Sequence, residues 1–220
     1  MSDLRIKYQT IEFNETDIHV RTLRDRQQYD DPYGRALKLD ISSAQWPLFG
    51  VIWPAGELLA RLMFDYKIEG KRILEVGCGI GLASLVLSHR LADITATDHH
   101  PEAEKFLEQN TTLNHLRTIP FVRTGWADSE TDLGKFDMII GSDLLYEDEH
   151  ADQLAFFVDQ HAKRTCHVII VDPGRCNTAR FSKNMVGRGY TYAPIDSTNV
   201  DELTQSAKQP KQFQILTYSR

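Results

Sequence analysis

Hydrophobic residues along this chain follow two different periods, and the change between them predicts a mixed α/β protein. Apolar and polar residues alternate in patches through residues 4–24, on either side of a polar centre at 14–16, which is typical of a β-hairpin. Residues 29–50 carry prolines, glycines and aromatic residues with no regular period, so we expect an irregular connection there. Pro54 then opens a stretch whose apolar residues recur at helical spacing, which predicts a helix.

From residue 72 onward, short apolar runs alternate with helical patterns. Strands are expected at residues 72–76, 92–98, 119–123, 136–141 and 167–171, and near 190–195 and 212–218. Helices are expected at residues 81–90, 101–113, 148–163 and 177–187. Apolar strands that alternate with helices are typical of a parallel sheet with helices on both faces. The last strand follows another strand without a helix between them, so it should run antiparallel.

These elements predict a doubly wound α/β protein with a seven-stranded, mostly parallel sheet whose last strand is antiparallel. We expect this domain to cover residues 51–220, and the β-hairpin and irregular extension to cover residues 1–50. A chain of 220 residues is long enough for one large domain with a substantial core, or for two small ones at most.

Composition narrows the classes of function. The formal net charge of −6 argues mildly against a nucleic-acid-binding protein, which normally shows a basic patch. Three irregularly spaced cysteines do not form a disulfide framework or a metal motif, and the histidines lack zinc spacing, so no metal is expected. The first residues lack the apolar core of a signal peptide, and no run approaches the ~20 apolar residues of a membrane span. We therefore expect a cytoplasmic protein that binds no membrane.

A glycine-rich loop at residues 73–82, with the sequence ILEVGCGIGL, is the sharpest motif in the chain. Glycines let the backbone turn tightly and approach a ligand closely. The third glycine is Gly81, and Leu82 takes the place where the dinucleotide fingerprint G-x-G-x-x-G has glycine. Glu75 lies close to this loop, which suits the cationic methionine end of S-adenosylmethionine better than a pyrophosphate. A nicotinamide dehydrogenase is therefore disfavoured, and a glycine turn without a ligand is the remaining alternative.

Asp98 ends the second strand of the predicted domain, 21 residues after Gly77. An acid at this distance can hydrogen-bond the hydroxyls of a ribose. Both NAD and S-adenosylmethionine contain a ribose, so Asp98 supports a nucleoside ligand without distinguishing the two.

The segment EVGCGIG, followed by a strand that ends in TATD, resembles the seven-β-strand class I methyltransferases over residues ~50 to 218. The resemblance implies S-adenosyl-L-methionine as cofactor, with Glu75, Gly77 and Gly79 at its methionine and ribose and Asp98 at its ribose. It also implies that Trp126 borders the adenine, although a core anchor is the alternative for this aromatic residue. Further cofactor-binding residues expected from the resemblance are Trp53, Cys78, Gly81, His99, Ser142 and Asp143.

The fourth strand of the predicted domain leads into Asp143-Leu144-Leu145-Tyr146, where the methyl acceptor is expected. Related enzymes that methylate planar amides carry Asn-Pro-Pro-Tyr at this place. A carboxylate only accepts hydrogen bonds, so Asp143 beside a phenol suits a cationic amine. The motif resembles the D/E-x-x-Y motif of the seven-β-strand protein lysine methyltransferases, which implies catalytic roles for Asp143 and Tyr146.

Other segments resemble the same branch. VIWPAG at 51–56 resembles the segment that precedes its glycine-loop motif, in which the tryptophan packs beside the methionine moiety of the cofactor. Asn110 and Asn114 resemble the asparagines of its second helix. Within this branch, the enzymes that modify the electron-transfer flavoprotein β-subunit show the strongest resemblance, which lies in segments 31–33, 53–54, 146–149 and 172–175. That group typically reads Asp-Met-Phe-Tyr at the acceptor motif, so the identity of the substrate is more open than the chemistry.

Several of these residues also have a structural interpretation. Asp143 can cap the turn after its strand, and Tyr146 can be a half-buried aromatic residue. The acidic residues 147–149 either recruit a basic substrate or stabilise a helix start, and the helix start is favoured. Arg175 either contacts the substrate or is a solvated loop residue.

The sequence as a whole predicts a monomeric methyltransferase that transfers a methyl group directly from S-adenosylmethionine to a lysine of a protein substrate. One alternative is a small-molecule or nucleic-acid N-methyltransferase with the same cofactor site, which protease and nuclease treatment of the labelled product would distinguish. The other is a non-catalytic protein that keeps the fold for binding. Erosion of the glycine loop or of Asp98 would indicate that alternative, and neither is eroded.

Overall fold

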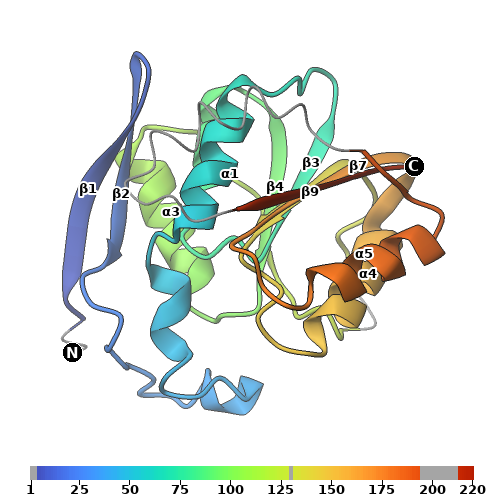
Figure 1. Cartoon of the computed structure of the whole chain (residues 1–220). Helices are drawn as coiled ribbons and strands as arrows, with labels where there is room; N and C mark the ends of the chain where they lie inside the picture. Colours follow the sequence, from blue (N-terminus) through green and yellow to red (C-terminus); the bar gives the residue numbers. More distant parts are fainter. Residues whose placement is uncertain (1–3, 129–130, 194–212) are drawn as a thin grey trace.

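The computed structural model describes residues 4–128, 131–193 and 213–220. Within these residues, a seven-stranded sheet lies at the centre with helices on both of its faces, and a two-stranded hairpin lies to one side (Figure 1). The central strands are β3 (Arg72–Val76), β4 (Asp93–Asp98), β5 (Phe121–Arg123), β6 (Phe136–Ser142), β7 (Ala162–Asp172), β8 (Thr191–Tyr192) and β9 (Gln214–Ser219). The helices are α1 (Pro54–Asp65), α2 (Leu82–His89), α3 (Ala103–Leu113), α4 (His150–His161) and α5 (Thr178–Gly187).

The strand order is β5-β4-β3-β6-β7-β9-β8, and β3 pairs in parallel with both β4 and β6. β9 runs antiparallel to both β7 and β8. The predicted fold class, a mostly parallel seven-stranded sheet with the last strand reversed, is confirmed. Because the chain leaves β3 to one side and returns through β6 on the other, the sheet has its topological switch point beside β3. Ligands bind at this point in doubly wound sheets, outside the carboxyl ends of the strands.

The pleat of β3 divides its residues between two cores. Ile73 faces the core that includes α1, α2 and α3, whereas Leu74 and Val76 face the core under α4 and α5. Successive side chains of a strand point to opposite faces, so Glu75 must lie on the side of α2. The strand therefore places a carboxyl group in the protein interior, directly below the glycine loop.

Two predicted boundaries differ from the structure at the junction of α4 and β7. The helix expected to reach residue 163 ends at His161, and β7 begins at Ala162 instead of 167. Residues 163–165 are polar and exposed, so they carry no apolar run. Backbone hydrogen bonds between Cys166 and Arg220, of 2.9 and 3.0 Å, hold this part of β7 in the sheet. The strand expected near 190–195 is confirmed at Thr191–Tyr192, and residues 194–195 lie outside the described residues, as does most of the polar segment after them.

The hairpin predicted at residues 4–24 is formed by β1 (Ile6–Phe13) and β2 (Thr16–Leu23). Two asparagine side chains of α3 hold the hairpin by hydrogen bonds to the backbone of β2, as a neighbouring strand would. Asn114 accepts a hydrogen bond from the backbone N–H of His19 (2.7 Å) and donates one to its carbonyl (2.6 Å). Asn110 pairs likewise with Arg21, at 2.6 and 3.3 Å. Four helical residues and two strand residues span nearly the same length, so the two amides match alternate residues of β2.

Residues 29–50, expected to be irregular, contain two short 3-10 helices, η1 (Leu37–Leu39) and η2 (Trp46–Gly50). Trp46 and Phe49 from this segment and Ile18 from the hairpin belong to the same core as α1–α3. The boundary predicted at residue 50 therefore does not separate two cores.

The stretch Trp46–Asp65 is long and apolar enough, by length and composition alone, to cross a membrane. It comprises η2 and α1, and 56% of its most apolar window is buried inside the protein. Leu59, Ala60 and Met63 of α1 are fully buried. Packing against the core accounts for the apolar character of this stretch.

Candidate active site

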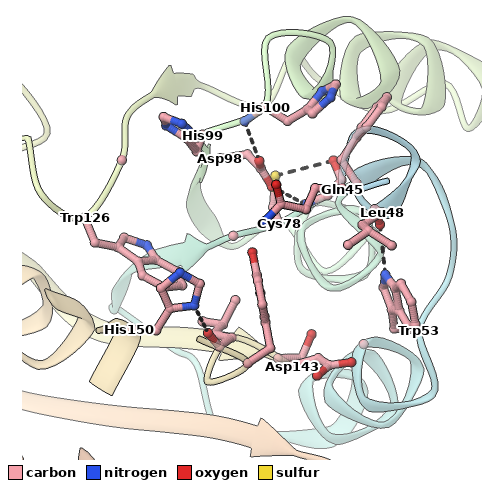
Figure 2. Close-up of a pocket in the computed structure, with 18 of the residues that line it drawn as sticks. Gln45, Leu48, Trp53, Cys78, Asp98, His99, His100, Trp126, Asp143 and His150 are labelled. Carbon is pink, nitrogen blue, oxygen red and sulfur yellow. Dashed lines mark hydrogen bonds between the residues drawn. The ribbon is translucent and has the colours of Figure 1, made fainter. Parts of the chain in front are cut away.

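A cavity of about 740 Å³ opens at the carboxyl ends of β3, β4 and β6, at the switch point of the sheet. Figure 2 shows side chains converging on it from both sides of the switch point. Its size lies within the range of small-molecule and cofactor sites. All the residues expected at the cofactor except Gly81 line it, together with the predicted acceptor residue Tyr146.

The glycine loop forms the floor of the cavity, and its backbone conformation requires glycine. Gly77, Gly79 and Gly81 have φ angles of 61°, 55° and 77°, in the left-handed region. A Cβ atom on Gly79 would lie 2.8 Å from the carbonyl oxygen of Phe49, and one on Gly77 would lie 2.5 Å from a methyl carbon of Leu144. The loop can therefore approach Phe49 and Leu144 this closely only because these positions are glycine. Gly81 does not line the cavity and is instead the N-cap residue of α2.

Glu75 lies beneath the loop and is almost completely buried. Its carboxylate accepts a hydrogen bond from the backbone N–H of Ser84 (2.8 Å) and another from the hydroxyl of Ser84. Burial raises the pKa of Glu75 to about 7, and the nearby charge of Asp98 acts in the same direction. Glu75 lines the cavity, and its hydrogen bonds to Ser84 connect it to the first turn of α2. A cation bound above it would favour its ionised form.

Asp98, at the end of β4, is held by two backbone hydrogen bonds. One carboxylate oxygen accepts from the N–H of Gly79 and the other from the N–H of His100, both at 2.8 Å. Burial raises the pKa of this carboxyl group, and the two backbone donors oppose that shift. Each oxygen keeps a further lone pair, so the pair can accept hydrogen bonds from two neighbouring hydroxyls of a ribose.

Aromatic rings form one wall of the cavity. The ring of Trp126 lies edge-on to that of His150, with the ring centres 5.0 Å apart. The ring of His150 in turn lies edge-on to that of Tyr146, with the centres 4.5 Å apart. Trp126 also packs against the core under α4 and α5, so its two predicted roles, at a ligand and at the core, are compatible. His150 was not predicted from the sequence, because a single histidine at a helix start carries no motif. Its Nδ1 lies 2.9 Å from the carbonyl oxygen of Leu144, and burial lowers its pKa.

The segment between residues 39 and 53 covers the cavity, a role that its aperiodic sequence does not reveal. Phe49 stacks on His100 with the ring centres 3.8 Å apart. His99 Nε2 lies 3.1 Å from the carbonyl oxygen of Leu39, which connects the end of β4 to this cover. Trp53 lines the cavity as predicted, and its indole N–H donates to the carbonyl of Leu48 (2.9 Å). Burial lowers the pKa of His100 to about 3, so this histidine is uncharged.

Asp143 lies at the predicted acceptor end, after β6. Its φ of 56° places it in the left-handed region, and its N–H donates to the carbonyl of Val171 in β7 (2.8 Å). Non-glycine residues rarely adopt this conformation, and those that do are concentrated at functional sites. Its side chain is 11% exposed, and one carboxylate oxygen accepts from Arg175 Nε (2.6 Å) and Nη2 (2.5 Å). We expected a carboxylate open to a substrate cation, whereas the structure gives it an arginine partner.

The turn that carries Arg175 is itself fixed. Asp172 is fully buried, and one of its oxygens accepts from the N–H groups of Gly174 (2.8 Å) and Arg175 (2.6 Å). The guanidinium carbon of Arg175 lies 5.7 Å from the centre of the Tyr146 ring. Burial and then the charges of Asp98 and Glu147 raise the pKa of Tyr146, so its phenol stays protonated at neutral pH. Arg175 is therefore a partly exposed residue whose guanidinium pairs with Asp143.

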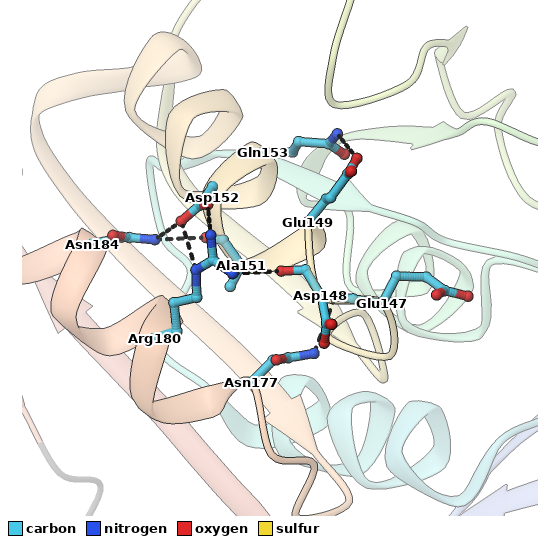
Figure 3. A network of polar contacts seen from close by, with 9 residues as sticks. All are labelled: Glu147, Asp148, Glu149, Ala151, Asp152, Gln153, Asn177, Arg180 and Asn184. Atoms are coloured by element: carbon cyan, nitrogen blue, oxygen red, sulfur yellow. Dashed lines mark hydrogen bonds and ion pairs between the residues drawn. The ribbon is translucent and has the colours of Figure 1, made fainter.

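The acidic residues that precede α4 have different surroundings (Figure 3). Arg180 donates to the backbone carbonyl of Asp148 and pairs with Asp152, which also accepts from Asn184 (2.6 Å). Glu149 accepts from Gln153, at 3.3 Å. Glu149 is the N-cap residue of α4, and no side-chain hydrogen bond caps this helix start. Glu147 differs, because its exposed side chain lines the mouth of the cavity.

The sheet topology and the position of this cavity define the class I methyltransferase fold, and comparison with solved structures agrees. The ribosomal protein L11 methylase of Lactobacillus delbrueckii aligns with a TM-score of 0.57 and 22% identity, over 74% of this chain and 77% of that one. Magnesium protoporphyrin IX methyltransferase of Synechocystis, solved with bound S-adenosylmethionine, aligns with a TM-score of 0.58 and 20% identity, over 76% and 77%. At such identities, these similarities show the fold.

Residues 36–185 match the model of the lysine methyltransferase family, and the chain belongs to this family. The electron transfer flavoprotein beta subunit lysine methyltransferase of Xenopus laevis is 31% identical, over 64% of this chain and 57% of that protein. Protein N-lysine methyltransferase METTL21A of Danio rerio is also 31% identical, over 49% and 54%. The chain spans about half the length of the curated relatives it matches. The predicted resemblance is confirmed.

Proposed function

We propose that this chain is a protein lysine N-methyltransferase that uses S-adenosylmethionine. The observation that carries the proposal is that one cavity joins the glycine loop and Asp98 to Asp143 and Tyr146. All four features lie inside the segment that matches the lysine methyltransferase family. A nucleoside site and an amine-compatible site in one cavity are what a methyl transfer between them requires.

The residues of the cavity fit the cofactor. Asp98 offers two oxygens to the ribose hydroxyls, and Gly77 and Gly79 line the cavity with backbone alone. Glu75 places a carboxyl group under the position expected for the positively charged methionine end. Trp126 offers an apolar ring to the adenine. S-adenosylmethionine bound here supplies a methyl group on a sulfonium, which is already a good leaving group.

The remaining task of the protein is to present a neutral amine in line with that methyl group. A free lysine amine has a pKa of about 10.4 and is mostly protonated at neutral pH, so it must lose a proton to water before it reacts. Asp143 and the protonated phenol of Tyr146 can orient the amine nitrogen through hydrogen bonds. Most of the rate acceleration should come from this positioning.

We further propose a protein substrate, and the electron-transfer flavoprotein β-subunit is the first candidate because several of the relatives that the chain matches are named for it. The exposed Glu147 at the mouth of the cavity is suited to a basic surface around the target lysine. From the composition, we propose that the enzyme works as a cytoplasmic monomer and binds neither nucleic acid nor membrane.

Labelling in a lysate tests this function. Cells that lack the protein supply the lysate, which is incubated with the purified chain and cofactor carrying a radioactive methyl group. We expect a labelled band that protease destroys and nuclease does not, and mass spectrometry should place the methyl group on a lysine. Asp143→Asn serves as the weakened control. A label that resists protease would contradict a protein substrate, and a label on another residue type would contradict lysine methylation.

A further inference from the structure

The acceptor end holds an ion pair that the methylation mechanism above does not use. Arg175 directs both Nε (2.6 Å) and Nη2 (2.5 Å) to a single oxygen of Asp143. The Asp143 side chain is 11% exposed and the Arg175 side chain 36%, so the carboxylate is largely shielded from water and the arginine is partly exposed. Ion pairs in such surroundings are screened much less than pairs on the surface. The carboxylate that would attract a substrate ammonium therefore already has a cation beside it.

Arg175 is held in this position from its own backbone. Asp172 binds the N–H groups of Gly174 and Arg175 through one oxygen. The second oxygen of Asp172 is buried and has no hydrogen-bond partner within the described residues. The turn therefore places the guanidinium against Asp143 and leaves a second carboxyl group behind it, which favours the positive charge of Arg175 at this place.

The charged groups around the Asp143–Arg175 pair determine the electrostatic environment of the substrate amine. Besides Asp143 and Arg175, the titratable groups that face this end are Tyr146, Glu147, His150, Asp172 and Asp98. Tyr146 and His150 are uncharged at neutral pH, because burial raises the pKa of the phenol and lowers that of the imidazole. Glu147 lies in solvent at the mouth, and Asp98 lies on the cofactor side. Close to the acceptor, and among the residues that the structure describes, Arg175 is thus the group that opposes a second cation.

We propose that Arg175 neutralises Asp143 and thereby makes the acceptor end select the uncharged form of the lysine amine. This inference rests on the proposed function. A neutral amine can donate a hydrogen bond to the second oxygen of Asp143 and keep its lone pair for the methyl group. An ammonium has no lone pair to react, and it would be repelled by Arg175 and by a cationic cofactor. Arg175 acts through Asp143 and is a positioning residue.

Binding of small probes tests the selection without a methylation assay. The protein is saturated with S-adenosylhomocysteine at pH 7 and titrated with n-butylammonium chloride or with uncharged n-butanol. The indole N–H signals of Trp53 and Trp126, which line the cavity, report binding in NMR spectra. We expect Arg175→Gln to bind n-butylammonium at least tenfold more tightly than the original protein does, with n-butanol binding changed less than twofold.

Three further variants separate this role from a structural one. Arg175→Lys keeps the charge and should retain most of the discrimination. The double variant Asp143→Asn, Arg175→Gln should not bind n-butylammonium more tightly than the original protein, because it has no carboxylate at position 143 to attract the ammonium. Arg180→Gln removes an arginine that pairs with Asp152 instead, and it should behave like the original protein. Equal n-butylammonium affinity in Arg175→Gln and the original protein, including undetectable binding to both, would overturn the inference.

The pH dependence of methyl transfer gives a second readout. Loss of the Arg175 charge should raise the pKa of the bound amine. The single-turnover rate of Arg175→Gln on the labelled lysine protein should therefore reach half its maximum about one pH unit higher. An unchanged profile would overturn the inference while the lysine product still supports the proposed function. Absence of methyl-lysine with the original protein would instead reject the proposed function, and the probe titration would still report on Arg175.

Discussion

The two ends of the cavity are built in different ways. At the cofactor end, Glu75, Gly79 and Asp98 come from two adjacent strands and the loop between β3 and α2, and each is fixed by hydrogen bonds to or from backbone N–H groups. At the acceptor end, Asp143 depends on the side chain of Arg175, which lies 32 residues further along the chain. The side chains of the cofactor end are therefore oriented by backbone N–H groups, whereas the side chain of Asp143 is oriented by another charged side chain.

This difference predicts that substitutions at one end of the cavity impair cofactor binding and substitutions at the other end impair methyl transfer. A change in the glycine loop or at Asp98 should impair cofactor binding whatever the acceptor is. A change at Asp143 should impair methyl transfer while leaving the cofactor bound. The following variants test whether the separation holds, beginning with the largest expected effect.

Gly79→Val should remove cofactor binding. A branched side chain disfavours the left-handed backbone conformation, and its Cβ would lie 2.8 Å from the carbonyl oxygen of Phe49. We expect S-adenosylhomocysteine affinity to fall by several hundredfold, about 3.5 kcal/mol, as measured by calorimetry. Gly187→Val is the matched control, because a Cβ at Gly187 meets no atom within 4 Å. Similar cofactor affinity in both variants would contradict the role of the loop.

Asp143→Asn should impair the acceptor end alone. The amide keeps the size of the side chain but removes the charge that holds Arg175 and orients the amine. Single-turnover methylation should fall about a hundredfold, equivalent to roughly 2.7 kcal/mol of transition-state stabilisation. Calorimetry should find nearly unchanged affinity for S-adenosylhomocysteine. Full activity in a well-folded variant would show that Asp143 only shapes its turn.

Asp98→Ala should produce the opposite pattern. The variant loses the acceptor for the ribose hydroxyls and also the partner of the Gly79 and His100 N–H groups. S-adenosylhomocysteine binding should weaken by about 1.5–3 kcal/mol, because hydrogen bonds to charged groups are among the stronger ones. At saturating cofactor, the single-turnover rate should recover most of its original value. A rate that stays low at saturation would mean that the two ends are coupled.

The smallest expected effect concerns the pH dependence of cofactor binding. Because the pKa of Glu75 is about 7, this group gains its negative charge as the pH rises from 6 to 8. A cationic ligand binds better to the ionised form, so S-adenosylmethionine affinity should increase by about threefold to tenfold over this range. Glu75→Gln has no such proton to lose and should give a flat profile. Parallel profiles for the two proteins in calorimetry would contradict this assignment.

Features that a local sequence pattern marks were predicted well, whereas contacts between distant segments were not. β3 and β4 were predicted within one residue, because β-branched and apolar residues mark each of them and the glycine loop that follows β3 has a distinctive spacing. The polar start of β7 was missed because the C-terminal residue Arg220 holds it, and no local pattern shows such a partner. The pairing of Arg175 with Asp143, and the stacking of Phe49 on His100, arise the same way. They depend on contacts between segments that only the fold brings together.

The asparagine contacts of the hairpin have a consequence for the order of folding. Asn114 and Asn110 reach residues that lie 95 and 89 positions earlier in the chain, so these contacts close long loops and should form late. Asn110 also donates to the carbonyl of Ile80 in the glycine loop, at 3.3 Å, and the cover of the cavity lies in the chain between the hairpin and α1. We therefore expect refolding chains to acquire their helices and central strands before they acquire affinity for the cofactor.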